Sequence, residues 1–255
     1  MTARPSTPEH VLDGRTVVIT RPAGTGSPLA RRVRRLGGEP LLLPGLSLHA
    51  VERPEAAAEA WRAALADDLL VFTSPAAVRF AMRLAPLHTH ATVLAVGKGT
   101  ARALKRAGID AAVPAERQDS EGLLEHPLLA APTGLRLALI GAPGGRGMLR
   151  AQLPARGAVL REVHVYRRGT PRWQKRQLDA LRRLPGDARV LLSSAEALEN
   201  LQRGLPADLF ARLSASVAVA SSERLADAAR AAGFQRVVVA KSALSDHLLA
   251  AAALP

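Results

Sequence analysis

Apolar and polar positions follow two alternating patterns along the chain. Short runs rich in Val, Leu and Ile are followed by longer Ala-, Arg- and Leu-rich segments whose apolar residues recur at helical spacing. This alternation is typical of parallel sheets whose strands are joined by crossover helices. It predicts strands at residues 16–20, 40–43, 69–72, 92–96, 111–113, 136–140, 158–165, 189–192, 216–220 and 236–239, and helices at 26–36, 54–66, 75–84, 99–107, 120–130, 146–155, 173–183, 195–203, 206–212, 222–232 and 243–252.

Three strand-to-helix segments occur twice, in the same order and about 120 residues apart. Residues 17–22, 70–78 and 95–100 match residues 137–143, 190–198 and 218–223, respectively. The period is far too long for a solenoid repeat, whose units run to roughly 20 to 50 residues. We therefore expect two similar α/β lobes. Two extended stretches, 44–51 and 162–169, lie at equivalent points of the repeats, and they would form two side-by-side connecting strands if each repeat crosses between lobes there.

Composition narrows the class of protein. No apolar run of the 255 residues approaches the roughly 18 to 20 needed to span a bilayer, and the first 14 residues lack the apolar core of a signal peptide, so we expect them to be a disordered leader. The absence of cysteine excludes disulfides, thiolate catalysis, Cys-ligated zinc and iron–sulfur clusters. A cytoplasmic location is the simplest interpretation.

The net charge of +13 favours anionic partners. Nucleic acid is not the expected partner, because the arginines are scattered over several helices and aromatic residues make up only 3% of the chain, too few for base stacking. A small anionic ligand is the better interpretation of the charge, and a merely soluble Arg-rich surface is the alternative.

Hydroxyl and glycine residues gather in the turns that follow the predicted strands. In a parallel sheet these turns lie at the carboxyl edge, where ligands collect and the N–H groups of helix N-termini attract anions. Taken singly, each such turn is an ordinary helix cap. Taken together, they suggest a cleft for one large ligand with several anionic groups. The residues concerned are Thr73, Ser74, Lys98, Gly99, Thr100, Ser194, Ser221 and Ser222.

The Gly-rich turn at residues 141–147 is a candidate phosphate loop of the dinucleotide-binding kind. Its spacing does not match G-x-G-x-x-G, so NAD or NADP is not expected. An anion-binding turn with Gly144 and Arg146 fits better, and a plain loop is the alternative. The seven histidines show no metal spacing. Tyr166 is the only tyrosine and lies on a connecting stretch; its phenol can assist a departing hydroxide, or it is simply an amphipathic linker residue.

The order and spacing of these motifs carry a family resemblance. The chain resembles the uroporphyrinogen III synthases, cofactor-free enzymes that close the tetrapyrrole ring. The matching segments cover nearly the whole chain after the leader: Val17–Pro22, Phe72–Val78, Val96–Leu104, Asp119–Leu124, Leu139–Arg150, Gly157–Arg168, Leu192–Leu201 and Val219–Phe234.

The resemblance implies two flavodoxin-like parallel-sheet domains joined by a two-stranded β ladder. We expect domain 1 to combine residues 1–44 and 169–255, domain 2 to span 51–163, and linkers at 45–50 and 164–168. The implied substrate is hydroxymethylbilane, a linear tetrapyrrole with eight carboxylates. In the family's reaction the hydroxymethyl group leaves as water to give an azafulvene. Attack by the substituted carbon of ring D then forms a spiro intermediate, whose breakdown and reclosure invert that ring.

Roles follow from the resemblance residue by residue. Tyr166 matches the tyrosine proposed to assist loss of the hydroxyl, and the hydroxyl residues of the cleft match Thr73, Ser74, Thr100, Ser194 and Ser222. Arg21 and Arg146 are expected carboxylate partners, and Lys98, Gly99, Gly144 and Ser221 complete the expected substrate site. Family members often have a threonine pair where this chain has Ser222-Glu223, so we expect Glu223 to point outward or to favour its helix N-terminus.

The resemblance also bears on partners and on a competing function. It suggests a monomer with no cofactor. Composition and motif spacing indicate no metal, no nucleic-acid partner and no membrane association. A transient contact with hydroxymethylbilane synthase stays open. The alternative function is a non-catalytic tetrapyrrole- or anion-binding protein or regulator that uses the same two lobes.

Overall fold

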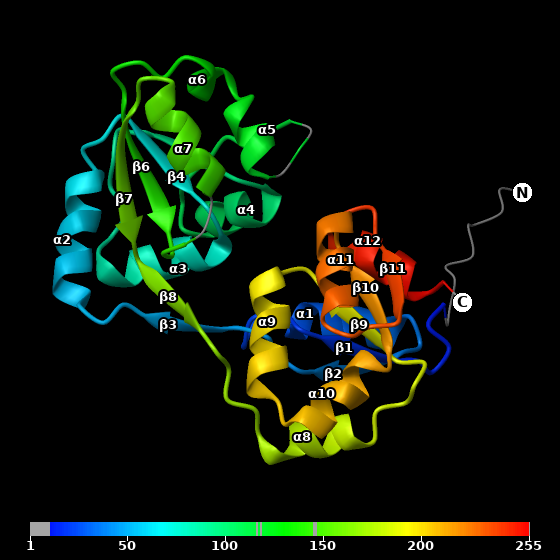
Figure 1. Cartoon of the computed structure of the whole chain (residues 1–255). Coiled ribbons are helices and arrows are strands. Elements are labelled where there is room, and N and C mark those ends of the chain that lie inside the picture. Colours follow the sequence, from blue (N-terminus) through cyan, green and yellow to red (C-terminus); the bar gives the residue numbers. More distant parts are fainter. Residues whose placement is uncertain (1–10, 116, 118, 145–146, 255) are drawn as a thin grey trace, which may run out of the picture. The chain divides into compact units, whose positions relative to one another are not determined.

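The computed structural model describes residues 11–115, 117, 119–144 and 147–254. The chain divides into two compact units (Figure 1). Unit 1 combines residues 1–47 and 169–255, and unit 2 comprises residues 48–168. No described helix is both long and apolar enough to cross a membrane.

Unit 1 is built on a five-stranded parallel sheet with the order β11-β10-β9-β1-β2. The strands are β1 (Thr16–Ile19), β2 (Glu39–Leu42), β9 (Arg189–Leu192), β10 (Val217–Ala220) and β11 (Arg236–Val239). In order of appearance within the unit this is 2-1-3-4-5 read from the β2 edge, the flavodoxin-like arrangement. Its helices are α1 (Ser27–Arg35), α8 (Lys175–Arg182), α9 (Ala195–Gly204), α10 (Ala207–Ser214), α11 (Glu223–Ala231) and α12 (Ser245–Ala252).

Unit 2 contains a four-stranded parallel sheet with the order β5-β4-β6-β7. The strands are β4 (Leu69–Phe72), β5 (Thr92–Ala95), β6 (Arg136–Gly141) and β7 (Val159–His164). The helices are α2 (Pro54–Ala64), α3 (Pro75–Leu84), α4 (Lys98–Arg106), α5 (Ser120–Leu124), α6 (Pro127–Ala130) and α7 (Gly147–Ala155). The mixed α/β fold with two parallel sheets confirms the predicted fold class.

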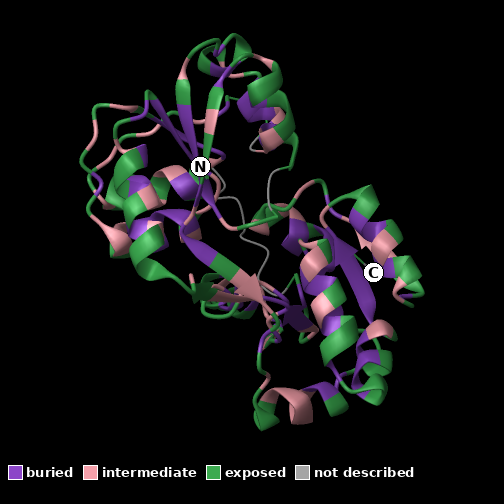
Figure 2. Ribbon diagram, turned by 60° about the vertical axis from the view of Figure 1, so that its left-hand side comes forward, coloured by how far each residue is buried: buried purple, intermediate pink, exposed green. Residues whose placement is uncertain are grey.

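Apolar residues on both faces of each strand explain why the sheets are covered on both sides. In β4, Leu70 and Phe72 pack with residues of α2, α3 and α4, whereas Leu69 and Val71 pack with residues of α5, α6 and α7. Successive side chains of a strand point to opposite faces, so a continuous apolar run needs helices on both. In unit 1, α8 to α11 cover one face and α1 and α12 the other. Figure 2 shows the central strands as buried ribbons among helices whose outer faces are exposed.

The chain passes between the units twice, at β3 (Ser47–Ala50) and β8 (Tyr166–Gly169). These two strands pair as a small antiparallel sheet, which confirms the predicted ladder. The crossing also divides the sequence repeat: β1 and β2 of the first copy share a sheet with β9 and β10 of the second, and β4 and β5 share a sheet with β6 and β7.

Three local expectations from the sequence are wrong. The strand expected at 111–113 is reduced to a single parallel bridge between Leu94 and Ala112, and Pro114, which has no N–H, cannot extend the ladder. The helix expected at 120–130 breaks into α5 and α6. The reason is Pro127 at the start of α6, which disfavours a helical conformation for His126, whose ψ is 133°.

The third concerns the leader expected over residues 1–14. Residues 11–14 belong to unit 1, because Leu12 is fully buried against the core of α1 and α12 and its N–H donates to the Leu36 carbonyl. Residues 1–10 lie outside the described part of the chain.

Two arginines bind the C-terminal end of α12. Arg189 is only 4% exposed, and its guanidinium donates to the carbonyls of Asp187, Ala252 and Leu254. Arg15 donates to Ala252, Ala253 and Leu254. The last carbonyls of a helix have no hydrogen-bond partner within the helix, and a cation at this end interacts favourably with the helix dipole. Burial and the charge of Arg15 lower the pKa of Arg189 below its ordinary value.

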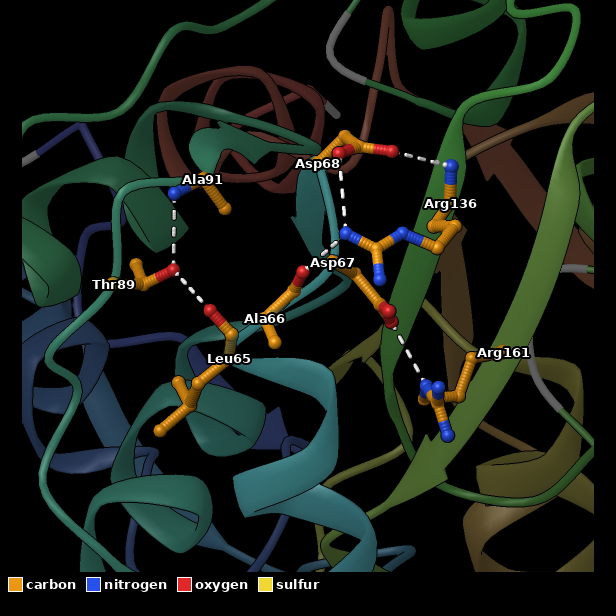
Figure 3. A network of polar contacts seen from close by, with 8 residues as sticks. All are labelled: Leu65, Ala66, Asp67, Asp68, Thr89, Ala91, Arg136 and Arg161. Carbon is orange, nitrogen blue, oxygen red and sulfur yellow. Dashed lines mark hydrogen bonds and ion pairs between the residues drawn. The ribbon is translucent and has the colours of Figure 1, made fainter.

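Two acidic residues that precede β4, Asp67 and Asp68, contact arginines on neighbouring strands of the unit 2 sheet (Figure 3). The buried carboxylate of Asp67 accepts from Nε of Arg161 on β7 at 2.8 Å. Asp68 accepts from the backbone N–H of Arg136 at 2.8 Å, and this bond together with the Arg136 side chain lowers the pKa of the Asp68 carboxyl. The two pairs connect the residues just before β4 with the first residue of β6 and the third residue of β7.

We expect Asp67→Asn to lower the free energy of unfolding by about 1–2 kcal/mol, because a charge-assisted hydrogen bond becomes a neutral one at a buried position. Urea unfolding followed by circular dichroism measures this change. The matched control is Asp110→Asn, an exposed position with no ion pair among the described residues. Equal midpoints for the two variants would show that the Asp67–Arg161 pair contributes nothing.

Candidate functional site

The carboxyl edge of each sheet has a point where successive connections leave in opposite directions. In unit 2 this switch point lies between β4 and β6, since β5 lies on one side and β7 on the other; in unit 1 it lies between β1 and β9. Ligands of open α/β sheets bind at such points. The turns predicted to bind substrate after β4, β6 and β9 therefore border the switch points, and so does the turn after β1.

In unit 2, three of the predicted residues converge beside this point. The Ser74 hydroxyl caps α3, accepting the Ala77 N–H at 3.0 Å, and lies 3.2 Å from the phenol oxygen of Tyr166. Thr73 donates its hydroxyl proton to the Ile140 carbonyl of β6 at 2.9 Å. Tyr166, the first residue of β8, is 7% exposed. The Tyr166 ring thus packs in the unit 2 core, and its phenol oxygen lies beside Ser74, the N-cap residue of α3.

Phe80 of α3 fixes the plane of the Tyr166 ring. The two rings are stacked, with centroids 5.4 Å apart and an angle of 18° between planes. The guanidinium carbons of Arg79 and Arg83 lie 5.3 and 5.5 Å from the centroid of the Phe80 ring. Sequence reasoning missed Phe80. Its spacing from Ala77 and Ala81 places it on the buried face of α3, but no local signal shows that its partner is the distant Tyr166.

The turn after β6 approaches the turn after β4 closely. A Cβ on Gly141 would lie 2.5 Å from the Thr73 hydroxyl oxygen, so only glycine fits there without a shift. Gly144 has a φ of +76°, a conformation that favours glycine, and Arg168 donates to the adjacent Pro143 carbonyl at 2.8 Å. Arg146, expected to bind a carboxylate, lies outside the described residues.

The turn after β5 opens α4 without a side-chain cap. Lys98 and Gly99 are exposed at the first two helical positions, and the N-cap is Gly97. Thr100 differs from these two residues because it is only 4% exposed, and the structure places most of its side chain beneath the surface. The exposed first turn of α4 thus offers backbone N–H groups and one cation.

In unit 1, the predicted serines also begin helices. Ser194 caps α9 through the Ala197 N–H at 3.3 Å, and Ser222 caps α11 through the Leu225 N–H at 3.4 Å. Ser221, half-buried, precedes that cap. Glu223 is exposed in the first turn of α11, where a negative charge favours the helix dipole.

Arg21 lies at the end of β1 and donates to the Ser245 hydroxyl of α12 at 3.1 Å. Burial, and secondly the positive charge of Arg32, lower the pKa of the Arg21 guanidinium below its ordinary value. Arg32 in turn forms an ion pair with Asp246. Arg21 is thus a partly buried cation whose side-chain partner among the described residues is neutral.

We expect Gly141→Ala to lower the free energy of unfolding by about 1–3 kcal/mol, because the added methyl group meets a hydroxyl that is already hydrogen-bonded to Ile140. Thermal unfolding measures the loss. Gly186→Ala, where the added carbon meets no atom within 4 Å, serves as the control. If both variants melt together, Thr73 can move without cost.

A family model, two related proteins and a solved structure that match this chain all belong to one family. Residues 27–250 match the family model described as uroporphyrinogen-III synthase HemD. Two relatives, both named uroporphyrinogen-III synthase, align over 92% of the chain and 99% of their own length: the protein of Salmonella typhimurium is 31% identical and that of Escherichia coli is 30% identical. The crystal structure of a mutant uroporphyrinogen III synthase from the bacterium Thermus thermophilus matches with a TM-score of 0.58 and 26% identity, covering 93% of this chain and 96% of that one.

Proposed function

The chain belongs to the uroporphyrinogen-III synthase family, and from that premise we propose how its own residues carry out the family's reaction. The enzyme is a cyclising lyase: it converts hydroxymethylbilane to uroporphyrinogen III with loss of water and inversion of ring D through a spiro intermediate. The observation that carries this function is the match to the family model over residues 27–250. The same comparisons fit the enzyme and not a non-catalytic regulator.

Positioning is the largest catalytic contribution in this proposal. A linear chain of four pyrroles closes correctly only if its ends are held in the spiro-forming geometry, and unassisted closure gives the uninverted isomer I. Holding two reacting carbons as a near-attack conformer removes most of the entropic part of the barrier. The turns at the carboxyl edges of the parallel sheets suit this task, because the sheets hold the backbone N–H groups of the turns in fixed positions.

Tyr166 is the proposed proton donor to the leaving hydroxyl group. In this step the bond from the hydroxymethyl carbon to oxygen breaks, the pyrrole electrons form an azafulvenium cation, and the hydroxide departs as water with the phenol proton. Transfer of the pyrrole N–H proton to the phenolate then gives the neutral azafulvene and restores the phenol. The position of Tyr166 supports the role: Phe80 fixes its ring, and Ser74 can donate to the phenol oxygen and stabilise negative charge that develops there. Because the Ala77 N–H donates to the Ser74 oxygen, the serine proton is free to point towards Tyr166.

The substrate carboxylates are the proposed partners of the remaining site residues. In unit 2 these are the first turn of α4, with Lys98 and Gly99, and Gly144 after β6, with Arg146 as a further proposed partner. Thr73, whose hydroxyl proton is donated to the Ile140 carbonyl, and Thr100, which is mostly buried, are proposed to support these turns rather than to bind a carboxylate. In unit 1 they are Arg21, Ser194, Ser221 and Ser222. The exposed, uncapped N-terminus of α4 supports this assignment, since backbone N–H groups and a nearby cation together favour an anion.

Three further features are proposed rather than established. The family resemblance supports a monomer, and the absence of cysteine is consistent with work in the cytoplasm. Hydroxymethylbilane closes without the enzyme, so a transient contact with the synthase that releases it would protect the yield of isomer III.

The product isomer tests the function directly. We expect purified protein given fresh hydroxymethylbilane to yield mainly isomer III, measured by chromatography after oxidation to the porphyrin. The no-enzyme reaction is the control, and it should yield isomer I. An isomer mixture that does not depend on the protein would contradict the assigned function.

We expect Tyr166→Phe to lower kcat on the order of 10²-fold, because it removes the proton donor and retains the ring that stacks on Phe80. Steady-state kinetics with isomer analysis measures the loss, and near-ultraviolet circular dichroism checks the fold. Thr100→Ala, which removes a hydroxyl from a mostly buried side chain of the same unit, should cost much less. A Tyr166→Phe enzyme with an unchanged kcat would remove Tyr166 from the reaction.

A further inference from the structure

A pocket of about 220 Å³ opens in unit 1 at the carboxyl ends of β1 and β2. The turn between β1 and α1 forms one wall, the residues after β2 form a second, and the start of α8 forms the third. The residues that line it include Arg21, Ser27, Arg172, Arg176 and Gln177. Arg172 and Arg176 belong to no motif that is recognisable in the sequence.

The walls of the pocket are held in place by backbone hydrogen bonds and close packing. Thr25 folds the β1–α1 turn by donating both its N–H and its hydroxyl proton to the Pro22 carbonyl, at 2.9 and 2.6 Å. A Cβ on Gly26 would lie 2.7 Å from Leu42, so the turn fits tightly against β2. Gln177 ties α8 to the Leu42 carbonyl at 2.6 Å. The pocket is therefore formed by the fold before any ligand arrives.

The charge of the lining is positive and uncompensated. Three arginines are among the residues that line the pocket, and none of the described lining residues is acidic. The side chains of Arg172 and Arg176 make no ion pair or hydrogen bond with any residue that the structure describes, and Arg21 donates only to the neutral Ser245. Like charges at one pocket repel one another, and an anion between them removes that cost. The planar fork of a guanidinium matches a carboxylate with two parallel hydrogen bonds.

The rest of the lining narrows the kind of anion. Ile19, Pro22, Leu42 and Pro44 give the pocket an apolar side. A free inorganic ion gains nothing from apolar contacts, whereas a carboxylate on a short alkyl stem buries its methylene groups there. We propose that this pocket is a carboxylate subsite for an alkyl-carboxylate side chain of the substrate, with Arg172 and Arg176 as its specificity-determining residues beside Arg21. The identity of the anion rests on the proposed function, and the anion-binding capacity of the pocket does not.

Kinetics of a double variant test the subsite. In Arg172→Gln/Arg176→Gln we expect KM for hydroxymethylbilane to rise about 10- to 100-fold with kcat largely unchanged, because the lost bonds hold substrate and transition state alike. Arg172→Lys/Arg176→Lys, which keeps the charges and loses the forks, should fall between this variant and the wild type. The control is Arg212→Gln, an exposed arginine of α10 with no partner among the described residues. A double Gln variant with the KM of this control would overturn the subsite.

Binding of glutarate separates the pocket from the enzymatic function. Glutarate carries carboxylates on a short alkyl chain and needs no turnover for its detection. At constant ionic strength, it should shift backbone amide resonances of residues 21–27 and 174–177 in the 15N-labelled wild type and not in the double Gln variant. If the wild type fails to make isomer III while these shifts remain, the function fails and the anion pocket stands. Shifts that are absent, or equal in the two proteins, would refute the pocket itself.

Discussion

Both sheets depend on hydrogen-bonded pairing between strands from opposite halves of the repeat. Val18 of β1 lies beside Val190 of β9, and Leu70 of β4 lies beside Ala138 of β6. Each pairing forms the switch point of its unit, where the polar turns gather. The contact of Thr73 with Ile140 and the close approach of Gly141 follow directly from the β4–β6 pairing. The functional geometry of each unit is therefore a property of two distant segments together, and neither repeat contains a site by itself.

Most of the fold can be predicted from the sequence because strand and helix patterns are local. Continuous apolar runs such as Leu69–Phe72 mark strands buried on both faces, and the glycines after the helices mark their ends. The wrong expectations arise where one residue overrides a pattern, as Pro127 does by ending one helix and starting the next. The stacking of Phe80 on Tyr166 could not be predicted, since ring contacts between distant segments leave no periodic signal.

The candidate site shows that helix capping and ligand binding are not competing roles for a hydroxyl. Ser74, Ser194 and Ser222 each accept a backbone N–H of their helix, which uses a lone pair and leaves the hydroxyl proton to donate elsewhere. The capping hydrogen bond also holds the hydroxyl oxygen in a fixed position. A polycarboxylate needs donors of this kind, already oriented and with no negative charge of their own. Arg172 and Arg176 could not be predicted as site residues from the sequence. No turn motif marks them, and the pocket forms only when α8 packs beside β2.

Because unit 1 is formed by two segments that flank unit 2 in the sequence, its sheet cannot be completed during synthesis until unit 2 has been made. Unit 2 is one continuous segment, and all four strands of its parallel sheet have been synthesised by residue 164. β1 and β2 are synthesised before unit 2, but the second edge of β1 is covered only by β9, which begins at residue 189. At roughly 5–20 residues per second this leaves an apolar strand pair unprotected for many seconds during synthesis. The nascent chain therefore exposes the edge of β1 that β9 covers in the folded protein, and such an edge favours aggregation until β9 has been made.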